Sequence, residues 1–163
     1  MTPYSMFVSH SMKQEDLAII YAACNDAVLR GITCYIAERD WQFGRPLPAK
    51  IDNAIRTCDC FVAFLTQDGA HSAWVNQEIG HAVACKKLRI LIVEQGVKVQ
   101  GFDVGNEYIP LDRSNPWDAI TKLNAYLSRL KLEKAEKLRN AGLLVLGILG
   151  LFFLGGSSED DKQ

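Results

Sequence analysis

Two short apolar runs in the middle of the chain constrain the fold most strongly. Residues 60–65 read Cys-Phe-Val-Ala-Phe-Leu, and residues 88–93 read Leu-Arg-Ile-Leu-Ile-Val. Neither run alternates between apolar and polar positions, which is typical of strands that are buried on both faces of a parallel sheet. Because both faces must then be covered, the chain needs helices on each side of its sheet. The runs therefore predict an α/β protein.

Strand and helix patterns alternate along the rest of the chain. Strands are expected at residues 4–8, 33–36, 60–65, 88–93 and 107–111, with helices at 14–29, 49–56, 72–85 and from 116 onward. This alternation predicts right-handed βαβ units in a flavodoxin-like, five-stranded parallel sheet. A ligand crevice is expected beyond the carboxyl ends of strands one and three, bordered by residues 9–11 and 66–72.

Composition and missing motifs exclude several classes of function. With 163 residues and a formal net charge of −1, the chain fits one domain plus an appendage and no nucleic-acid partner is expected. Its five cysteines, without a C-x-x-C pair, argue against a disulfide framework or a zinc ribbon. No G-x-G-x-x-G or P-loop motif is present, and the third strand ends in Leu65-Thr66 rather than in the aspartate of a phosphoacceptor receiver. The first strand follows Met1 so closely that no signal peptide is expected.

The helix expected at residues 72–85 has two stripes of side chains. Its core stripe consists of Val75, Ile79 and Ala82, and its second stripe of Trp74, Glu78, His81 and Cys85. The second stripe places an indole and a carboxylate one turn apart beside the expected crevice. Spacing alone favours a solvent-facing Glu78 next to a half-buried Trp74. Glu78 and His81 also form half of a di-iron E-x-x-H pair, but the chain has no second copy.

Four segments occur in the order and spacing of one known domain family. They are residues 6–11, residues 34–40 followed by Gly44-Arg45-Pro46, residues 55–66, and residues 74–78, which read Trp-Val-Asn-Gln-Glu. They resemble the first-strand box, the second strand with its BB loop and the third helix–strand box of a Toll/interleukin receptor (TIR) domain, and the W-x-x-x-E signature of the enzymatic branch of that family. The resemblance covers about residues 4–130, is strongest to the NAD-cleaving prokaryotic branch, and implies a TIR domain at residues 1–130.

The resemblance implies an enzyme that hydrolyses NAD⁺ at the nicotinamide–ribosyl bond. Glu78 matches the family's catalytic glutamate and Trp74 its tryptophan, while Ser9 and His10 lie where the first loop meets the substrate. His10 fits a polar residue at a strand end equally well. One carboxylate suffices because nicotinamide leaves as a neutral group, while positive charge develops on the ribose. NAD⁺ is the substrate, and no further cofactor or metal is implied.

The products and the biological setting follow only from the family. Release of nicotinamide leaves ADP-ribose or, if the adenine ring attacks, a cyclic ADP-ribose isomer, and the family uses such enzymes as signalling or defence effectors. The alternative is a non-catalytic TIR–TIR interaction module in membrane-associated signalling. Because most scaffolding members lack a glutamate at this position, Glu78 favours the enzyme.

The BB loop supplies further candidates for substrate binding. Arg39, Trp41 and Phe43 lie in this loop, which in the family contacts a neighbouring subunit and can complete a composite site. The resemblance therefore implies a homo-oligomer that forms through TIR–TIR contacts. An exposed Trp41 suits an interface hot spot, and local packing is its other interpretation. The loop departs from the family by reading Phe43-Gly44-Arg45-Pro46.

The last part of the chain is strongly apolar. Residues 141–156 are sixteen positions without a polar side chain, which as a helix span about 24 Å. With two serines added, they predict a transmembrane segment at residues 141–158 of a bilayer core about 30 Å thick. Basic residues dominate positions 131–140 and acidic residues positions 159–163, which predicts a single-pass protein with a cytoplasmic TIR domain. The alternatives are a buried or partner-binding helix and a pore-forming effector.

Overall fold

The computed structural model describes residues 3–36, 49–98 and 108–155. In chain order its elements are β1 (Tyr4–Ser9), α1 (Gln14–Leu29), β2 (Ile32–Ile36), α2 (Ala49–Thr57), β3 (Cys60–Leu65), α3 (Gln67–Ala70), α4 (Ala73–Ala84), β4 (Leu88–Glu94), β5 (Tyr108–Leu111) and α5 (Pro116–Gly155). The contacts within the chain divide it into two units, residues 1–128 and residues 129–163. Both the sheet and the candidate site lie in the first unit.

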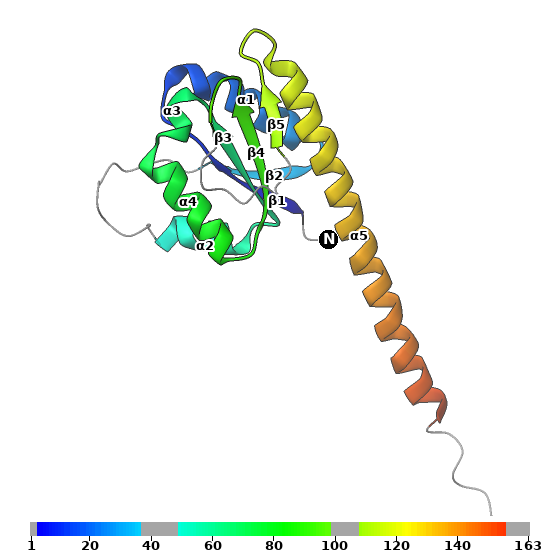
Figure 1. Cartoon of the computed structure of the whole chain (residues 1–163). Coiled ribbons are helices and arrows are strands. Elements are labelled where there is room, and N and C mark those ends of the chain that lie inside the picture. Colours follow the sequence, from blue (N-terminus) through cyan, green and yellow to red (C-terminus); the bar gives the residue numbers. More distant parts are fainter. Residues whose placement is uncertain (1–2, 37–48, 99–107, 156–163) are drawn as a thin grey trace, which may run out of the picture. The chain divides into compact units, whose positions relative to one another are not determined.

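The sheet has the order β2-β1-β3-β4-β5, and every neighbouring pair is parallel (Figure 1). This confirms the predicted five-stranded, flavodoxin-like sheet. The chain winds outward from β1 in one direction to β2 and in the other through β3 to β5. The reversal therefore falls between β1 and β3, where the register pairs Ser9 with Ala63. Ligands of such sheets bind beyond the strand ends at this point.

Helices cover both faces of the sheet, as the two apolar runs require. On one face, α2 and α4 pack on side chains such as Phe7, Phe61 and Leu65. On the other face, α1 and residues 116–128 of α5 enclose Phe64 and Ile92. Every residue of β3 is buried, because successive side chains enter the two different layers of core.

Local sequence signals fix the ends of the helices near the sheet. Ser72 caps α4, since its hydroxyl accepts a hydrogen bond from the backbone N–H of Val75 at 3.4 Å. Gly31, between α1 and β2, has a φ of 71°, a conformation that glycine adopts without strain. The sequence did not predict α3, which begins where the Thr66 hydroxyl accepts from the N–H of Gly69 at 3.0 Å.

The prediction of a transmembrane helix is wrong, and so is the prediction of a single-pass membrane localisation, which depended on that helix. In the part of the chain that the structure describes, no helix is long and apolar enough to cross a membrane. The described part of α5 runs to Gly155, so it contains residues 141–155 of the apolar run. Fifteen residues span only about 22 Å, against a bilayer core of about 30 Å. Residues 156–163, which include the end of the predicted segment and the acidic tail, lie outside the described residues.

Candidate active site

A serine and a glutamate meet at the carboxyl end of β1. The Ser9 hydroxyl donates a short hydrogen bond to Oε2 of Glu78 on α4. Both residues are 0% exposed. Because a hydroxyl that bonds a carboxylate makes a charge-assisted hydrogen bond, this contact fixes both side chains strongly. Of the residues predicted to form the site, these two are in direct contact.

The amphipathic pattern of α4 explains how Glu78 reaches this position. Val75, Ile79 and Ala82 are at most 1% exposed and pack on the sheet, as the sequence predicted. Glu78 lies one turn from Val75 and from Ala82, so it enters the protein at the border of that apolar face. The alternative of a solvent-facing Glu78 is therefore wrong, whereas Trp74 is half-buried, as that interpretation expected.

His10 follows Ser9 and is also buried, at 1% exposure. Its Nδ1 lies 2.5 Å from the carbonyl oxygen of Ser11. A carbonyl oxygen can only accept, so Nδ1 carries the proton and donates. The contact orients the imidazole ring against the loop that follows β1.

A second polar cluster stands beside this loop, centred on Asp16 at the start of α1. Its Oδ2 accepts hydrogen bonds from Ser11 Oγ and, at 2.6 Å, from Thr66 Oγ1. Its Oδ1 accepts from a guanidinium nitrogen of Arg113 at 2.5 Å. Burial raises the pKa of Asp16, but the hydrogen bonds from Ser11, Thr66 and Arg113 outweigh it and hold the pKa below its ordinary value. Asp16 is therefore ionised at neutral pH.

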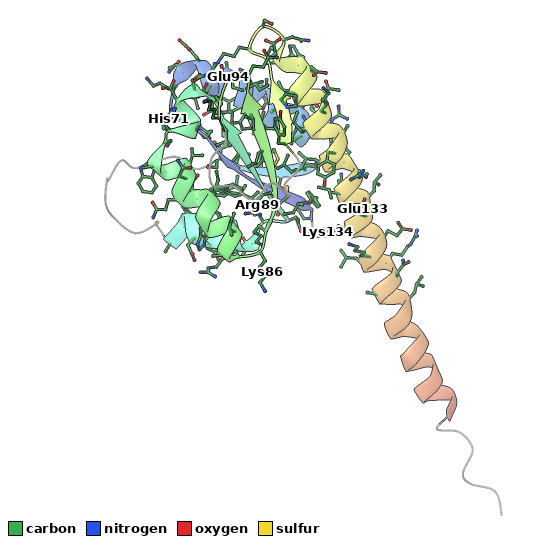
Figure 2. The ribbon with its side chains drawn as sticks, viewed as in Figure 1. His71, Lys86, Arg89, Glu94, Glu133 and Lys134 are labelled. Atoms are coloured by element: carbon green, nitrogen blue, oxygen red, sulfur yellow. The ribbon has the colours of Figure 1, made fainter. Side chains whose placement is uncertain are left out.

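Arg113 extends this cluster to the end of β4. Its Nε lies 2.5 Å from Glu94 Oε1, and a second nitrogen donates to Oε2 at 3.1 Å. The hydrogen bonds to Glu94, followed by those to Asp16, raise the pKa of Arg113. The backbone N–H of Gln67 also donates to Glu94 at 2.9 Å. Figure 2 shows Glu94 at the carboxyl end of the sheet, while Arg89 on the same strand lies toward the amino end.

Of the four residues in this cluster, the sequence placed Thr66 in a segment that borders the expected crevice but did not point to Asp16, Glu94 or Arg113. The sequence does contain a signal for three residues of the cluster. Thr66, Glu94 and Arg113 are polar residues at or just after the carboxyl ends of β3, β4 and β5. In a parallel sheet these ends meet at one edge. Their pairing with Asp16 depends on where α1 begins, which the pattern of the strands does not give.

The remaining predicted residues fall into two groups. Arg39, Trp41 and Phe43, the BB-loop candidates, lie outside the described residues. His81 is turned toward α2, where its Nε2 lies 2.7 Å from Asp52 Oδ1. Among residues 3–36, 49–98 and 108–143, no group of three or more His, Cys, Asp or Glu side chains is arranged to hold a metal ion.

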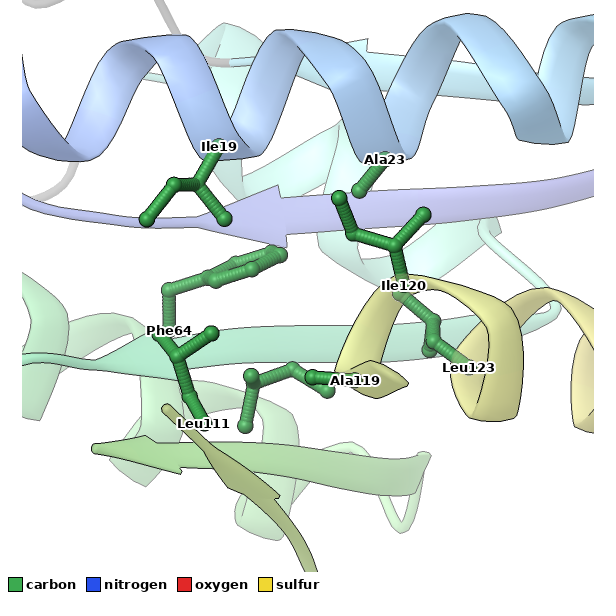
Figure 3. Close-up of a pocket in the computed structure, with 8 residues that line it drawn as sticks. Ile19, Ala23, Phe64, Leu111, Ala119, Ile120 and Leu123 are labelled. Carbon is green, nitrogen blue, oxygen red and sulfur yellow. The ribbon is translucent and has the colours of Figure 1, made fainter. Parts of the chain in front are cut away.

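An apolar pocket lies in the core and is lined by side chains of α1, α5 and the sheet (Figure 3). It is enclosed by α1, residues 116–128 of α5 and the sheet, with Phe64 and Ile92 in its wall. It has no room for a water molecule. This pocket is a packing gap in the core and offers no polar group to a ligand.

Comparison with known proteins identifies the family. The TIR domain family matches residues 6–124, which is most of the chain, and the chain therefore belongs to the TIR domain family. The predicted resemblance to a TIR domain is confirmed. No curated protein matches the chain in sequence.

Several solved structures share the fold at low sequence identity. The TIR domain of the Toll-related receptor TRR-2 from Hydra magnipapillata is 14% identical, with a TM-score of 0.59 over 76% of this chain and 98% of that one. The CMP N-glycosidase BcmB of Clostridium botulinum is 20% identical, with a TM-score of 0.54 over 75% and 98%. A diflavin flavoprotein A3 from Nostoc sp. is 12% identical, with a TM-score of 0.53 over 82% and 99%. At these identities the similarity shows the fold alone.

Proposed function

We propose that the protein is a TIR enzyme that hydrolyses NAD⁺ at the nicotinamide–ribosyl bond. The observation that carries the proposal is the Glu78 carboxylate, held by the Ser9 hydroxyl at the reversal point of the sheet. Its partner in the W-x-x-x-E signature, Trp74, is half-buried one turn earlier on α4. A similar fold in a CMP N-glycosidase supports N-glycoside cleavage as the class of reaction.

The chemistry requires one carboxylate and no general acid. As the bond between C1′ of the ribose and the pyridinium nitrogen breaks, its electron pair goes to the nitrogen and nicotinamide leaves neutral. The ribose becomes an oxocarbenium ion, whose positive charge a carboxylate stabilises. Water then adds to C1′ and releases one proton to solvent, which gives ADP-ribose. Attack by the adenine ring instead gives a cyclic isomer.

Ser9 has a defined part in this scheme. Its hydroxyl occupies one oxygen of Glu78, so the carboxylate is fixed before the substrate binds. A preorganised charge stabilises a transition state without first having to reorient. Trp74 forms an aromatic wall, and His10 and the BB-loop residues Arg39, Trp41 and Phe43 contact the rest of NAD⁺. In this proposal TIR–TIR contacts through the BB loop build a homo-oligomer that completes the site.

One observation favours a second candidate, a non-catalytic TIR–TIR interaction module. Glu78 is 0% exposed and its side chain is bonded within the protein, so substrate must displace covering groups to reach it. A buried carboxylate bonded to a serine also serves as a purely structural link between a helix and a strand. The two candidates differ in whether Glu78 is needed for turnover.

The test measures NAD⁺ consumption and identifies the products, using the full-length chain at high concentration. The variant is Glu78→Gln, which keeps the shape of the side chain and removes its charge. The matched control is Glu15→Gln, an exposed glutamate on α1. Wild type and control are expected to release nicotinamide, and Glu78→Gln to lose at least about 100-fold in kcat.

The products and the variant separate the two candidates. ADP-ribose identifies a hydrolase and a cyclic product identifies a cyclase. If the wild type assembles into oligomers without consuming NAD⁺, the result favours the interaction module over the enzyme as the function of this protein. If Glu78→Gln consumes NAD⁺ as fast as the control, the assignment of Glu78 is wrong.

A further inference from the structure

We propose that Asp16 and Arg113 are positioning residues for the Ser9–Glu78 pair, acting through Ser11. The inference rests on the proposed function and assigns two residues that lie outside the W-x-x-x-E signature. Neither touches Ser9 or Glu78 in the contacts described above. Both act on the loop after β1, in which His10 and Ser11 follow Ser9.

This loop begins where the strand pairing of β1 ends. The register between β1 and β3 ends at the pair Ser9 and Ala63, and that between β1 and β2 ends at Val8. Beyond Ser9 no strand partner fixes the backbone of the β1 segment in the described sheet. Ser9 is the last residue of β1 that this pairing holds, so the two residues that follow it need an anchor outside the sheet.

Asp16 supplies that anchor from the first turn of α1. Its carboxylate is 1% exposed and binds the Ser11 hydroxyl, the Thr66 hydroxyl and the Arg113 guanidinium. Thr66 directly follows β3, the strand that pairs with Ser9. One carboxylate thus links the loop after β1 to the end of the neighbouring strand, at the point where the winding of the sheet reverses.

Arg113 holds Asp16 in its ionised, bonded state. Removing the guanidinium would leave two carboxylates, Asp16 and Glu94, without their cation in a largely buried setting. Uncompensated buried charge is costly, so the cluster would rearrange or take up a proton. Either change loosens Ser11, and the displacement passes along two residues of chain to Ser9. Displacements of about 1 Å in a catalytic group lower rates by up to about 100-fold.

The test is a double-mutant cycle on NAD⁺ hydrolysis by the full-length protein. The single variants are Arg113→Met and Ser9→Ala, and the double variant combines them. Arg113→Lys is the conservative variant, because it keeps the positive charge. Arg30→Met is the matched control, since Arg30 forms an exposed ion pair with Asp26 at the other end of α1. Rates are given per folded molecule, at a temperature well below the unfolding midpoint.

We expect Arg113→Met to lower kcat about tenfold with KM for NAD⁺ within about twofold. Arg113→Lys should recover most of the loss, and Arg30→Met should match wild type. In the Ser9→Ala background, Arg113→Met should have little further effect, because the hydroxyl that it positions is already gone. Hydrogen exchange of the amides of residues 10–12 should also become faster in Arg113→Met, while that of β3 stays unchanged.

Three results would overturn the inference. Unchanged kcat in Arg113→Met, with an active wild type, refutes the positioning role and leaves the proposed function intact. A loss that adds fully to that of Ser9→Ala shows that Arg113 acts on stability or on substrate rather than through Ser9. A wild type that does not hydrolyse NAD⁺ overturns the proposed function, and this inference with it.

Discussion

The Ser9 hydroxyl donates a hydrogen bond to the Glu78 carboxylate, although 69 positions separate the two residues in the sequence. Ser9 is the last residue of β1, and Glu78 lies in the middle of α4. The contact therefore joins the sheet to the helix that carries the family's W-x-x-x-E signature. It is the feature of the structure on which a catalytic role for Glu78 depends most directly.

Replacing Ser9 with alanine should lower kcat for NAD⁺ hydrolysis about tenfold or more. Hydrogen bonds to charged groups contribute about 1.5–3 kcal/mol, and about 1.4 kcal/mol corresponds to a factor of ten in rate. The matched control is Ser5→Ala, because Ser5 lies on the same strand and its hydroxyl bonds Asp59 at 3.2 Å. Steady-state kinetics measure both variants. Equal losses in the two would show that the effect comes from β1 as a whole.

Two glycines should respond to alanine in opposite directions. A Cβ on Gly69 would overlap the carbonyl oxygen of Phe64, while a Cβ on Gly80 would meet no heavy atom within 4 Å apart from its chain neighbours and the backbone of its own helix. We expect Gly69→Ala to lower the free energy of unfolding by about 1–3 kcal/mol. Gly80→Ala should raise it by about 0.5–1 kcal/mol, because alanine favours a helix interior. Chemical denaturation followed by circular dichroism measures both, and a destabilised Gly80→Ala would contradict this packing of α4.

Asp16 should make stability depend on pH in the acid range. Because its pKa is lowered in the folded state, its contribution is present above the unfolded value of about 4 and is lost as the pH falls through the folded value. Asp16→Asn should be about 2 kcal/mol less stable at pH 7, because it loses hydrogen bonds to a charged group, and its stability should fall less as the pH is lowered below about 4. Asp118→Asn, at an exposed ion pair with Lys122, is the control. Parallel pH profiles for wild type and Asp16→Asn would refute the role of this carboxylate.

The two faces of α4 should differ in their tolerance of truncation. Ile79 is 1% exposed within the core and Val83 is 47% exposed on the same helix. Ile79→Ala should cost about 2–5 kcal/mol of unfolding free energy through lost burial and a cavity. Val83→Ala should change it by no more than about 0.5 kcal/mol. Similar losses in equilibrium denaturation would mean that α4 does not pack on the sheet as described.

Most of the fold was predictable because it follows from local patterns. The apolar runs at 60–65 and 88–93 require a sheet covered on both faces, and the alternation of strands and helices leads to the parallel order that the structure has. The short helix α3 was missed because four residues are too few for a helical period. The transmembrane prediction is wrong, because in the part of the chain that the structure describes no helix is long and apolar enough to cross a membrane.

The sequence by itself determined the sheet, the core stripe of α4 and the four boxes that identify a TIR domain. These depend on periodicity and on residue order, which are properties of contiguous segments. Only the tertiary structure decided that Glu78 is buried against Ser9, and that Asp16, Thr66, Glu94 and Arg113 form one cluster. Residues on separate elements meet through the packing of helices on a twisted sheet. Helical spacing gives the direction of a side chain around its own axis, but not which neighbour it meets there.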